Sequence, residues 1–197
     1  MKPIVLYPNA VLRVKTKIID QIDGQLVTDI DQLTEVLLAN ENGAGLAAVQ
    51  LGITRRFFGI KNSTLKKVDL FINPTIVGTY GNRDWIKIKG VAKGGEGKIA
   101  DEDFLEGCLS FPDLYGMVKR WLKIRAHWEE LVAGKLVVHE ADLNGFEAIV
   151  FQHELDHLDG ILFIDHIKRD GGKLFHQIGE KMEEISLKSL KSESSKV

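Results

Sequence analysis

Apolar residues recur at helical spacing in two parts of the chain. In the first, a helix over residues 29 to 40 is predicted by apolar positions three and four apart: Ile30, Leu33 and Leu37. Thr28 and Asp31 have the spacing of a capping box at its start. The second helix is predicted over residues 146 to 158, and Gly160 stands where a C-terminal glycine would end it.

Short runs rich in β-branched and aromatic residues, bounded by Asn, Gly or Pro, predict strands. These runs cover residues 56 to 60, 68 to 72, 75 to 80, 84 to 88, 118 to 128 and 136 to 143. In the fifth run, apolar Leu122, Ile124 and Ala126 alternate with larger or charged residues. A last helix is predicted over residues 173 to 188. Strands that do not alternate regularly with helices favour an α+β fold, with small antiparallel or mixed sheets around the helix at 146 to 158 and a C-terminal helix.

Two polar segments interrupt this pattern. Residues 89 to 103 are rich in Gly, Lys, Asp and Glu, which predicts an inserted solvated loop. The Ser- and Lys-rich residues 189 to 197 predict a disordered tail. With 197 residues in all, we expect a single domain over residues 1 to 188.

Composition excludes several classes of protein. Lys plus Arg number 26 and Asp plus Glu number 28, giving a net charge of −2, so a strongly basic nucleic-acid binder is not expected. No apolar run approaches the roughly 20 residues of a membrane helix, and we expect no membrane partner. Cys108 is the one cysteine, which favours a reducing compartment, and the N-terminus has no pattern of a targeting segment. We therefore expect a cytoplasmic protein.

The segment His153-Glu154-Leu155-Asp156-His157 is an H-E-x-x-H sequence inside the second predicted helix. Its two histidines are four residues apart and project from one helix face, where both can reach one metal ion. A catalytic metal normally has three protein ligands and an open position, so a third ligand is required.

Two sources for that third ligand are open. Downstream candidates are His166, His176, Glu180, Glu183 and Glu184, and none of them has a motif around it. Upstream, Cys108 lies in Glu106-Gly107-Cys108-Leu109-Ser110. A lone cysteine is commonly a small buried hydrophobic residue, but a thiolate is also a strong metal ligand, and the local sequence favours that role.

A glycine-rich segment precedes these motifs, from Gly43 to Gln50. Gly43, Gly45 and Ala48 match a dinucleotide-binding fingerprint, but that fingerprint needs a strand before it and a helix after it. Here a helix precedes, so we do not expect nucleotide binding. The glycines instead predict close approach of the backbone to a ligand, and Gln50 offers a neutral amide donor.

In their order and spacing, the three segments Gly43 to Gln50, Glu106 to Ser110 and Gln152 to Gly160 resemble the motifs of peptide deformylases. The resemblance extends from Pro8 to about Phe163. It implies hydrolytic removal of the formyl group from formylmethionyl peptides, with release of formate. It also implies that Cys108, His153 and His157 hold one divalent metal ion, which is Fe²⁺ in the cell and can be Zn²⁺, Ni²⁺ or Co²⁺ in purified protein.

The resemblance also implies roles for the other residues. Glu154 moves protons, while the Gln50 side chain and the Leu109 backbone N–H stabilise the oxyanion. The implied substrate-binding residues are Ala44, Gly45, Leu46, Gly107, Phe146, Ile149 and Val150. Many members carry a larger aliphatic residue at the position of Ala44, so we expect a wider methionine pocket.

Partners follow from the same resemblance. The substrate is an N-formylmethionyl peptide, and contact with the ribosome is expected of an enzyme that acts on nascent chains. The interleaved Lys and Glu residues after position 173 are also typical of a solvated helix. Two other functions are weighed: a zinc metalloendopeptidase with a downstream third ligand, and a non-catalytic binding module stabilised by metal.

Overall fold

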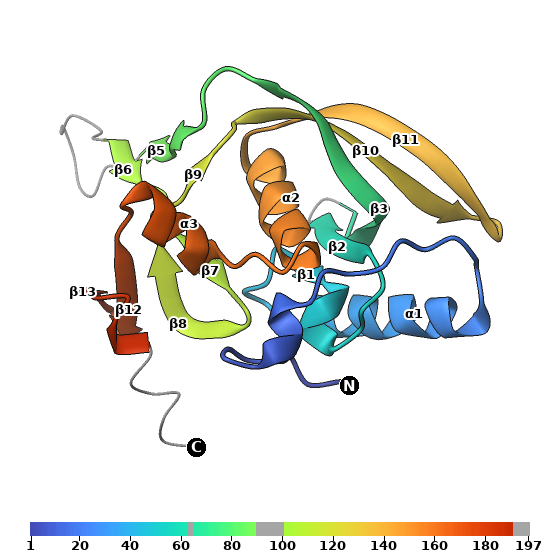
Figure 1. Ribbon diagram of the computed structural model, residues 1–197, viewed down its shortest axis with the longest axis horizontal. Coiled ribbons are helices and arrows are strands. Elements are labelled where there is room, and N and C mark those ends of the chain that lie inside the picture. Colours follow the sequence, from blue (N-terminus) through green and yellow to red (C-terminus); the bar gives the residue numbers. More distant parts are fainter. Residues whose placement is uncertain (63–64, 90–100, 191–197) are drawn as a thin grey trace. The chain divides into compact units, whose positions relative to one another are not determined.

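The computed structural model describes residues 1–62, 65–89 and 101–190 (Figure 1). Contacts within the chain divide it into two compact units. The first unit comprises Met1–Gly81, Leu109–Pro112 and Trp121–Leu162. The second comprises Asn82–Cys108, Asp113–Arg120 and Phe163–Val197.

The first unit contains an antiparallel sheet of five strands in the order β1-β2-β3-β10-β11. The strands are β1 (Gly45–Ala47), β2 (Phe57–Asn62), β3 (Lys67–Tyr80), β10 (Lys123–Val132) and β11 (Lys135–Asn144). Its helices are η1 (Ala10–Arg13), α1 (Gly24–Ala39), η2 (Ala48–Leu51) and α2 (Gly145–Leu158). In Figure 1 the helix α2 runs alongside the sheet. Within this sheet, β10 and β11 form a long antiparallel hairpin.

The two long helices bury opposite faces of this sheet. Neighbouring residues of a strand point to opposite faces, and in β2 Phe57 packs in the core cluster of α1 whereas Phe58 packs in that of α2. The Phe58 ring meets Phe151 of α2 edge to face, with centroids 5.1 Å apart. Phe71 meets the same ring at 5.4 Å. Phe151 of α2 therefore packs against an aromatic ring from each of two neighbouring strands.

Helix α1 begins earlier than the sequence pattern predicts. Its N-cap is Asp23, whose side chain accepts a hydrogen bond from Leu26 N at 2.7 Å. Thr28 lies inside the helix, where its hydroxyl donates to the Gly24 carbonyl oxygen. The predicted capping box of Thr28 and Asp31 is therefore wrong, because Asp23 is also a strong N-cap residue and is held by two hydrogen bonds from Arg55.

Three strand predictions need correction. The predicted strand over residues 84 to 88 is two strands, β4 (Asp84–Trp85) and β5 (Lys87–Lys89), which pair with different partners. Residues 68 to 80 form one strand, β3, because Asn73 turns the backbone at φ 49° and the ladder continues past it. The predicted strand over residues 118 to 128 is two strands, β9 (Lys119–Arg120) and β10. Leu122, at the break, is 52% exposed instead of buried.

The second unit carries a sheet in the order β13-β12-β8-β7, of which β8 begins in the first unit. Its strands are β7 (Glu106–Cys108), β8 (Phe111–Gly116), β12 (Leu174–Ile178) and β13 (Lys181–Ile185). Two separate antiparallel pairs join β4 (Asp84–Trp85) to β9 and β5 (Lys87–Lys89) to β6 (Asp101–Asp103). One α-helix, α3 (Phe163–Asp170), completes the unit.

The predicted C-terminal helix over residues 173 to 188 is wrong. Residues 174 to 185 form the hairpin β12–β13, in which Ile178 pairs with Lys181 across a two-residue turn. Gly179 has φ 61°, the conformation that the first turn position of such a hairpin requires. The pairing of β12 with β8 then outweighs the helical charge pattern.

Several other expectations are settled by the described residues. The α+β class is confirmed, with antiparallel sheets and helices. Lys89 and residues 101–103 belong to β5 and β6 rather than to a loop, and residues 90–100 of the predicted insertion lie outside the described residues. Of the predicted tail, Leu190 is buried and residues 191–197 lie outside the described part. Within that part, no helix is long and apolar enough to span a membrane.

Removal of the Phe151 ring tests how α2 is held. We expect Phe151→Ala to lower the free energy of unfolding by about 3–5 kcal/mol, because it empties a fully buried site among aromatic rings. Phe146→Ala on the same helix is the matched control, since that ring is 58% exposed and should cost far less. Denaturant titration of both variants measures the difference, and equal costs would contradict this packing.

Candidate metal centre and active site

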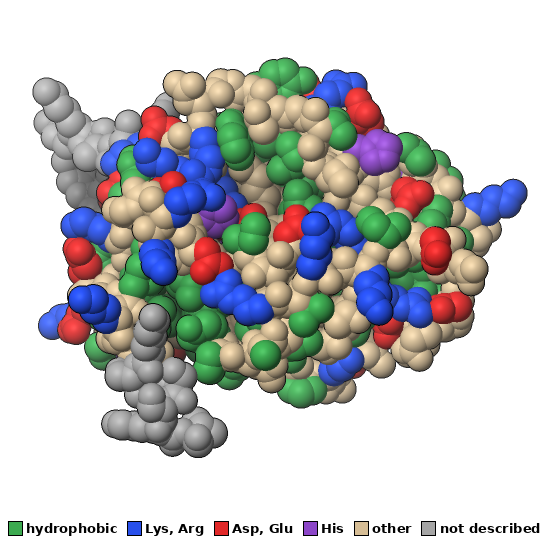
Figure 2. Space-filling model, in the orientation of Figure 1, with side chains coloured by type: hydrophobic (Ala, Val, Ile, Leu, Met, Phe, Trp, Pro, Cys, Tyr) green, Lys and Arg blue, Asp and Glu red, His purple; other side chains and the backbone are tan. Residues whose placement is uncertain are grey.

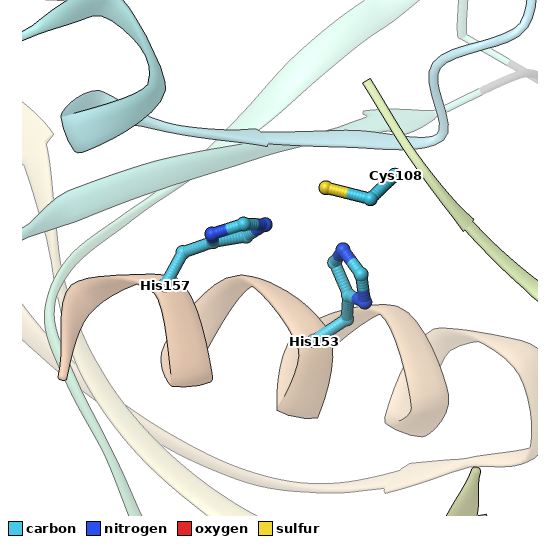
Figure 3. A group of neighbouring side chains, drawn as sticks. All are labelled: Cys108, His153 and His157. Carbon is cyan, nitrogen blue, oxygen red and sulfur yellow. The ribbon is translucent and has the colours of Figure 1, made fainter. Parts of the chain in front are cut away.

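Cys108, His153 and His157 form a compact group of potential metal ligands. One ligand atom from each side chain lies within 4.8 Å of the others, and Figure 3 shows the sulfur and both imidazoles directed at a common centre. The two histidines stand one turn apart on α2, with ring centroids 5.0 Å apart. Cys108 is the last residue of β7 and is bonded directly to Leu109.

The donor set fits a catalytic metal ion. A thiolate and two imidazoles combine a soft donor with two borderline donors, which suits first-row transition metals. Three protein ligands leave a position for water or substrate. Both histidines are buried, and a metal ion is one kind of partner that can satisfy a buried imidazole nitrogen. Among the described residues, the downstream candidates from His166 to Glu184 are not part of this group.

The C-terminal end of α2 is fixed by three donors to one carbonyl. The oxygen of Leu158 accepts from the backbone N–H of Thr16 at 2.8 Å and from its hydroxyl at 2.9 Å. The buried guanidinium of Arg56 reaches the same oxygen at 3.5 Å and binds the Asp159 carboxylate at 2.9 Å. A cation at this end also complements the helix dipole. The turn that carries His157 is therefore held by the first unit itself.

Gln152, next to His153, fixes the rotation of α2. Its side-chain amide donates to the Trp121 carbonyl oxygen at 2.7 Å, and its carbonyl oxygen accepts from Trp121 N at 3.1 Å. The amide thus pairs with the backbone at the break between β9 and β10, as a neighbouring strand would. With Gln152 held, His153 projects from a defined face of the helix.

Glu154 is 3% exposed and lies against the backbone of β1. A Cβ atom on Gly45 would lie 2.6 Å from its Oε1 atom, which is closer than real Cβ contacts come. Only glycine therefore allows the strand and the carboxylate to approach this closely.

Gln50 has its amide oriented by two neighbours. Its Oε1 accepts from Ala47 N at 2.9 Å, and its Nε2 donates to the Ser110 hydroxyl oxygen at 3.1 Å. Ser110 in turn accepts from Tyr7 N through its carbonyl oxygen. These contacts link the segment around Gln50 to the residues that follow Cys108.

Arg120 and Glu106 form a buried ion pair that motif reasoning missed. The Arg120 Nε and Nη2 atoms donate to the two Glu106 oxygens at 2.7 and 2.9 Å, and both side chains are almost fully buried. Glu106 begins the strand β7 that ends at Cys108, so the pair fixes the cysteine strand within its unit. The two residues are 14 positions apart. No local pattern signals such a pair, although buried charges do need partners.

The predicted substrate-binding residues lie in different environments. Ile149 and Val150 are buried on α2, whereas Phe146 is exposed. Leu46 is fully buried in the core of α1, so its backbone alone remains available to a ligand. At Gly107 a Cβ atom would lie 2.8 Å from the Tyr115 ring.

A cavity of about 420 Å³ opens in the first unit beside these residues. Its lining includes Gly43 and Ala44 before β1, and Phe146 and Val150 of α2. Three of the predicted substrate-binding residues therefore share one cavity. Acidic and basic side chains are interspersed over the face shown in Figure 2, without a large patch of one sign.

Comparison with known proteins shows the family to which this chain belongs. The family model for polypeptide deformylase matches residues 1–173. The chain belongs to the peptide deformylase family. The peptide deformylase of Agrobacterium fabrum is 35% identical over 174 residues, which cover 86% of this chain and 88% of that protein. That of Aquifex aeolicus is 36% identical over 177 residues, covering 85% and 88%.

Solved peptide deformylases also share the fold. The Thermotoga maritima enzyme has a TM-score of 0.65 at 32% identity, covering 84% of this chain and 97% of its own. The Synechococcus elongatus enzyme, solved in complex with actinonin, has a TM-score of 0.65 at 25% identity, covering 86% and 85%. The predicted family is confirmed. Peptide deformylases are metal-dependent hydrolases that remove the N-terminal formyl group from nascent peptides.

The contact between Gly45 and Glu154 gives a test of the site. We expect Gly45→Ala to lower kcat/KM for a formylmethionyl peptide by about 100-fold, because displacement by about 1 Å can cost that much. Metal content should stay near that of the unchanged protein. Gly24→Ala is the matched control, since a Cβ atom there meets nothing within 4 Å. A fully active Gly45→Ala protein would show that Glu154 need not lie where the structure has it.

Proposed function

We propose that Cys108, His153 and His157 hold one divalent metal ion in this deformylase. Support comes from the convergence of their ligand atoms within 4.8 Å, next to Glu154 on the same helix. When bound, such an ion supplies Lewis acidity and lowers the pKa of a coordinated water toward about 7. This convergence is the single observation on which the proposal depends.

Glu154 is the proton carrier of the proposed reaction. It accepts the proton of the attacking water and then delivers it to the amine, because an amide nitrogen leaves poorly until it is protonated. Burial of this carboxylate against β1 supports the role, since a packed carboxylate is held in one orientation. Glu154 is not one of the three proposed metal ligands.

Gln50 and Leu109 are the proposed donors to the oxyanion that develops on the formyl oxygen. Ala47 N donates a hydrogen bond to Gln50 Oε1, so the amide nitrogen of Gln50 points away from Ala47. Leu109 contributes its backbone N–H, immediately after Cys108. Donors placed in advance stabilise the transition state without reorganisation.

The proposed peptide site is built on β1. This strand is the last in its sheet, and the backbones of Gly45 and Leu46 can pair with an extended peptide. Gly107 is the proposed backbone partner from β7. The methionine side chain is proposed to contact Ala44, Phe146, Ile149 and Val150.

The remaining features of the proposal concern the whole chain. The family match over residues 1–173 supports one catalytic domain over residues 1 to 188. A thiolate with two imidazoles accepts Fe²⁺, Zn²⁺, Ni²⁺ or Co²⁺, and we propose Fe²⁺ as the ion in the cell. Because the substrates are nascent chains, we also propose contact with ribosomes in the cytoplasm.

Two substitutions separate metal binding from proton transfer. Glu154→Ala should retain the metal and lose deformylation by at least about 100-fold, the usual contribution of a general acid and base. Cys108→Ala should lose both metal and activity, because two imidazoles alone coordinate the ion poorly. Metal analysis and a formate-release assay on a formylmethionyl peptide measure these outcomes.

Each substitution has a result that contradicts its assignment. Loss of metal in Glu154→Ala would make this residue a ligand. A metal-replete Cys108→Ala protein would place the third ligand elsewhere, as the endopeptidase hypothesis requires. Cleavage of an internal peptide bond in an unformylated peptide would favour that hypothesis directly.

The identity of the metal controls sensitivity to oxygen. An iron-loaded protein should lose activity in air with oxidation at Cys108, because a thiolate on a redox-active ion is exposed to the sulfenic-to-sulfonic series. The nickel form should remain active. Both forms are loaded anaerobically, exposed to air and followed by formate release and by the mass of the Cys108 peptide. Equal survival of the two forms would refute the prediction.

A further inference from the structure

A short segment near the start of the chain binds the backbone beside both proposed oxyanion donors. Val5 N donates to the Gln50 carbonyl oxygen at 2.7 Å, and Tyr7 N donates to the Ser110 carbonyl oxygen at 3.0 Å. Gln50 carries the proposed side-chain donor, and Ser110 directly follows Leu109, which carries the proposed backbone donor. All these residues belong to the first unit. The segment therefore holds the two donor-bearing stretches of chain at once.

The two stretches are also joined to each other. Gln50 Nε2 donates to the Ser110 hydroxyl oxygen at 3.1 Å, and both side chains are almost fully buried. An amide nitrogen has two N–H groups, so this atom can donate one to Ser110 and direct the other at a formyl oxygen. The direction of the second N–H thus depends on where Ser110 lies. Because Tyr7 binds the backbone of Ser110, its position affects the side-chain donor as well.

The ring of Tyr7 holds this residue in place. It stacks on Phe111 with centroids 4.7 Å apart and an angle of 21° between the planes. Phe111 is 3% exposed and directly follows Ser110, so ring and backbone bind neighbouring residues. Aromatic pairs of this kind contribute stability beyond the area that they bury. Among the described residues, the Tyr7 hydroxyl makes no hydrogen bond. The contact therefore depends on the ring and not on the hydroxyl group.

We propose that Tyr7 is a positioning residue for deformylation. Through its bond to Ser110 it holds the two oxyanion donors in the geometry that the transition state requires, and its stack on Phe111 keeps it there. The inference rests on the proposed oxyanion role of Gln50 and Leu109. Donors stabilise a transition state when they are placed in advance, and a displacement of about 1 Å can cost about 100-fold in rate.

Three variants of the metal-loaded full chain test the role of the ring on a formylmethionyl peptide. We expect Tyr7→Ala to lower kcat by about tenfold and to change KM by less than about twofold, because misplaced donors weaken binding of the transition state more than of the substrate. Tyr7→Phe keeps the stack and should retain the full kcat. Leu6→Ala is the matched control on the same segment, since that side chain is 48% exposed.

Either of two results with these variants would overturn the inference. One is an unchanged kcat in Tyr7→Ala at equal metal content. The other is a loss in Tyr7→Phe or Leu6→Ala as large as the loss in Tyr7→Ala, which would show that the stack on Phe111 is not what matters.

A double substitution separates positioning from a general weakening of the structure. Gln50→Leu removes one donor outright and should lower kcat by about 10²–10³-fold. In that background Tyr7→Ala should cost about threefold or less, because one of the groups that it positions is gone. A full tenfold loss in the double variant would overturn the inference while leaving the proposed function intact. Full activity of Gln50→Leu would instead contradict the oxyanion role in the proposed function, and the inference with it.

Discussion

The carbonyl oxygen of Leu158, held by Thr16 and Arg56, determines where the last turn of α2 lies. At the other side of the same helix, Gln152 binds both backbone polar atoms of Trp121. A helix held at its end and about its axis cannot rotate without breaking buried hydrogen bonds, which cost about 1–3 kcal/mol each when left unmade. These contacts therefore fix the positions of three residues on α2: His153, Glu154 and His157.

Gly45 allows β1 to lie close to the helix α2 that these contacts hold in place. Because hydrogen bonds hold α2 in position, β1 can come this close to the Glu154 carboxylate only with a residue that has no side chain. The same strand ends its sheet, where an extended peptide can pair. The proposed proton transfer and the proposed peptide recognition thus share one edge of one sheet, next to one helix.

Local chemistry made part of this arrangement predictable. The histidine spacing on α2 is a property of the helix, and Gly160 has the positive φ that ends it, so both could be predicted from sequence. The ion pair between Arg120 and Glu106, which holds the strand of Cys108, could not be predicted from sequence, because the fold alone brings these two residues together. Likewise, the C-terminal charge pattern predicted a helix, whereas the turn at Gly179 and pairing with β8 produced a hairpin.

Side-chain direction was the least predictable property of the candidate site. Leu46 lies in a motif implied to bind substrate, yet its side chain is fully buried in the core because the pleat of β1 directs it toward α1. Phe146 has helical spacing with the buried residues of α2 but lies in the first turn, where it is exposed. Such differences depend on which elements cover a position, and sequence spacing does not contain that information.

X-ray absorption spectroscopy of the zinc-loaded protein tests the central claim most directly. We predict one sulfur neighbour at about 2.3 Å and two imidazole nitrogens at about 2.0–2.1 Å, with a further light atom completing the site. The sulfur signal should be absent from Cys108→Ala. A zinc site with nitrogen and oxygen neighbours alone in the unchanged protein would contradict the assignment of Cys108, His153 and His157 as the metal ligands.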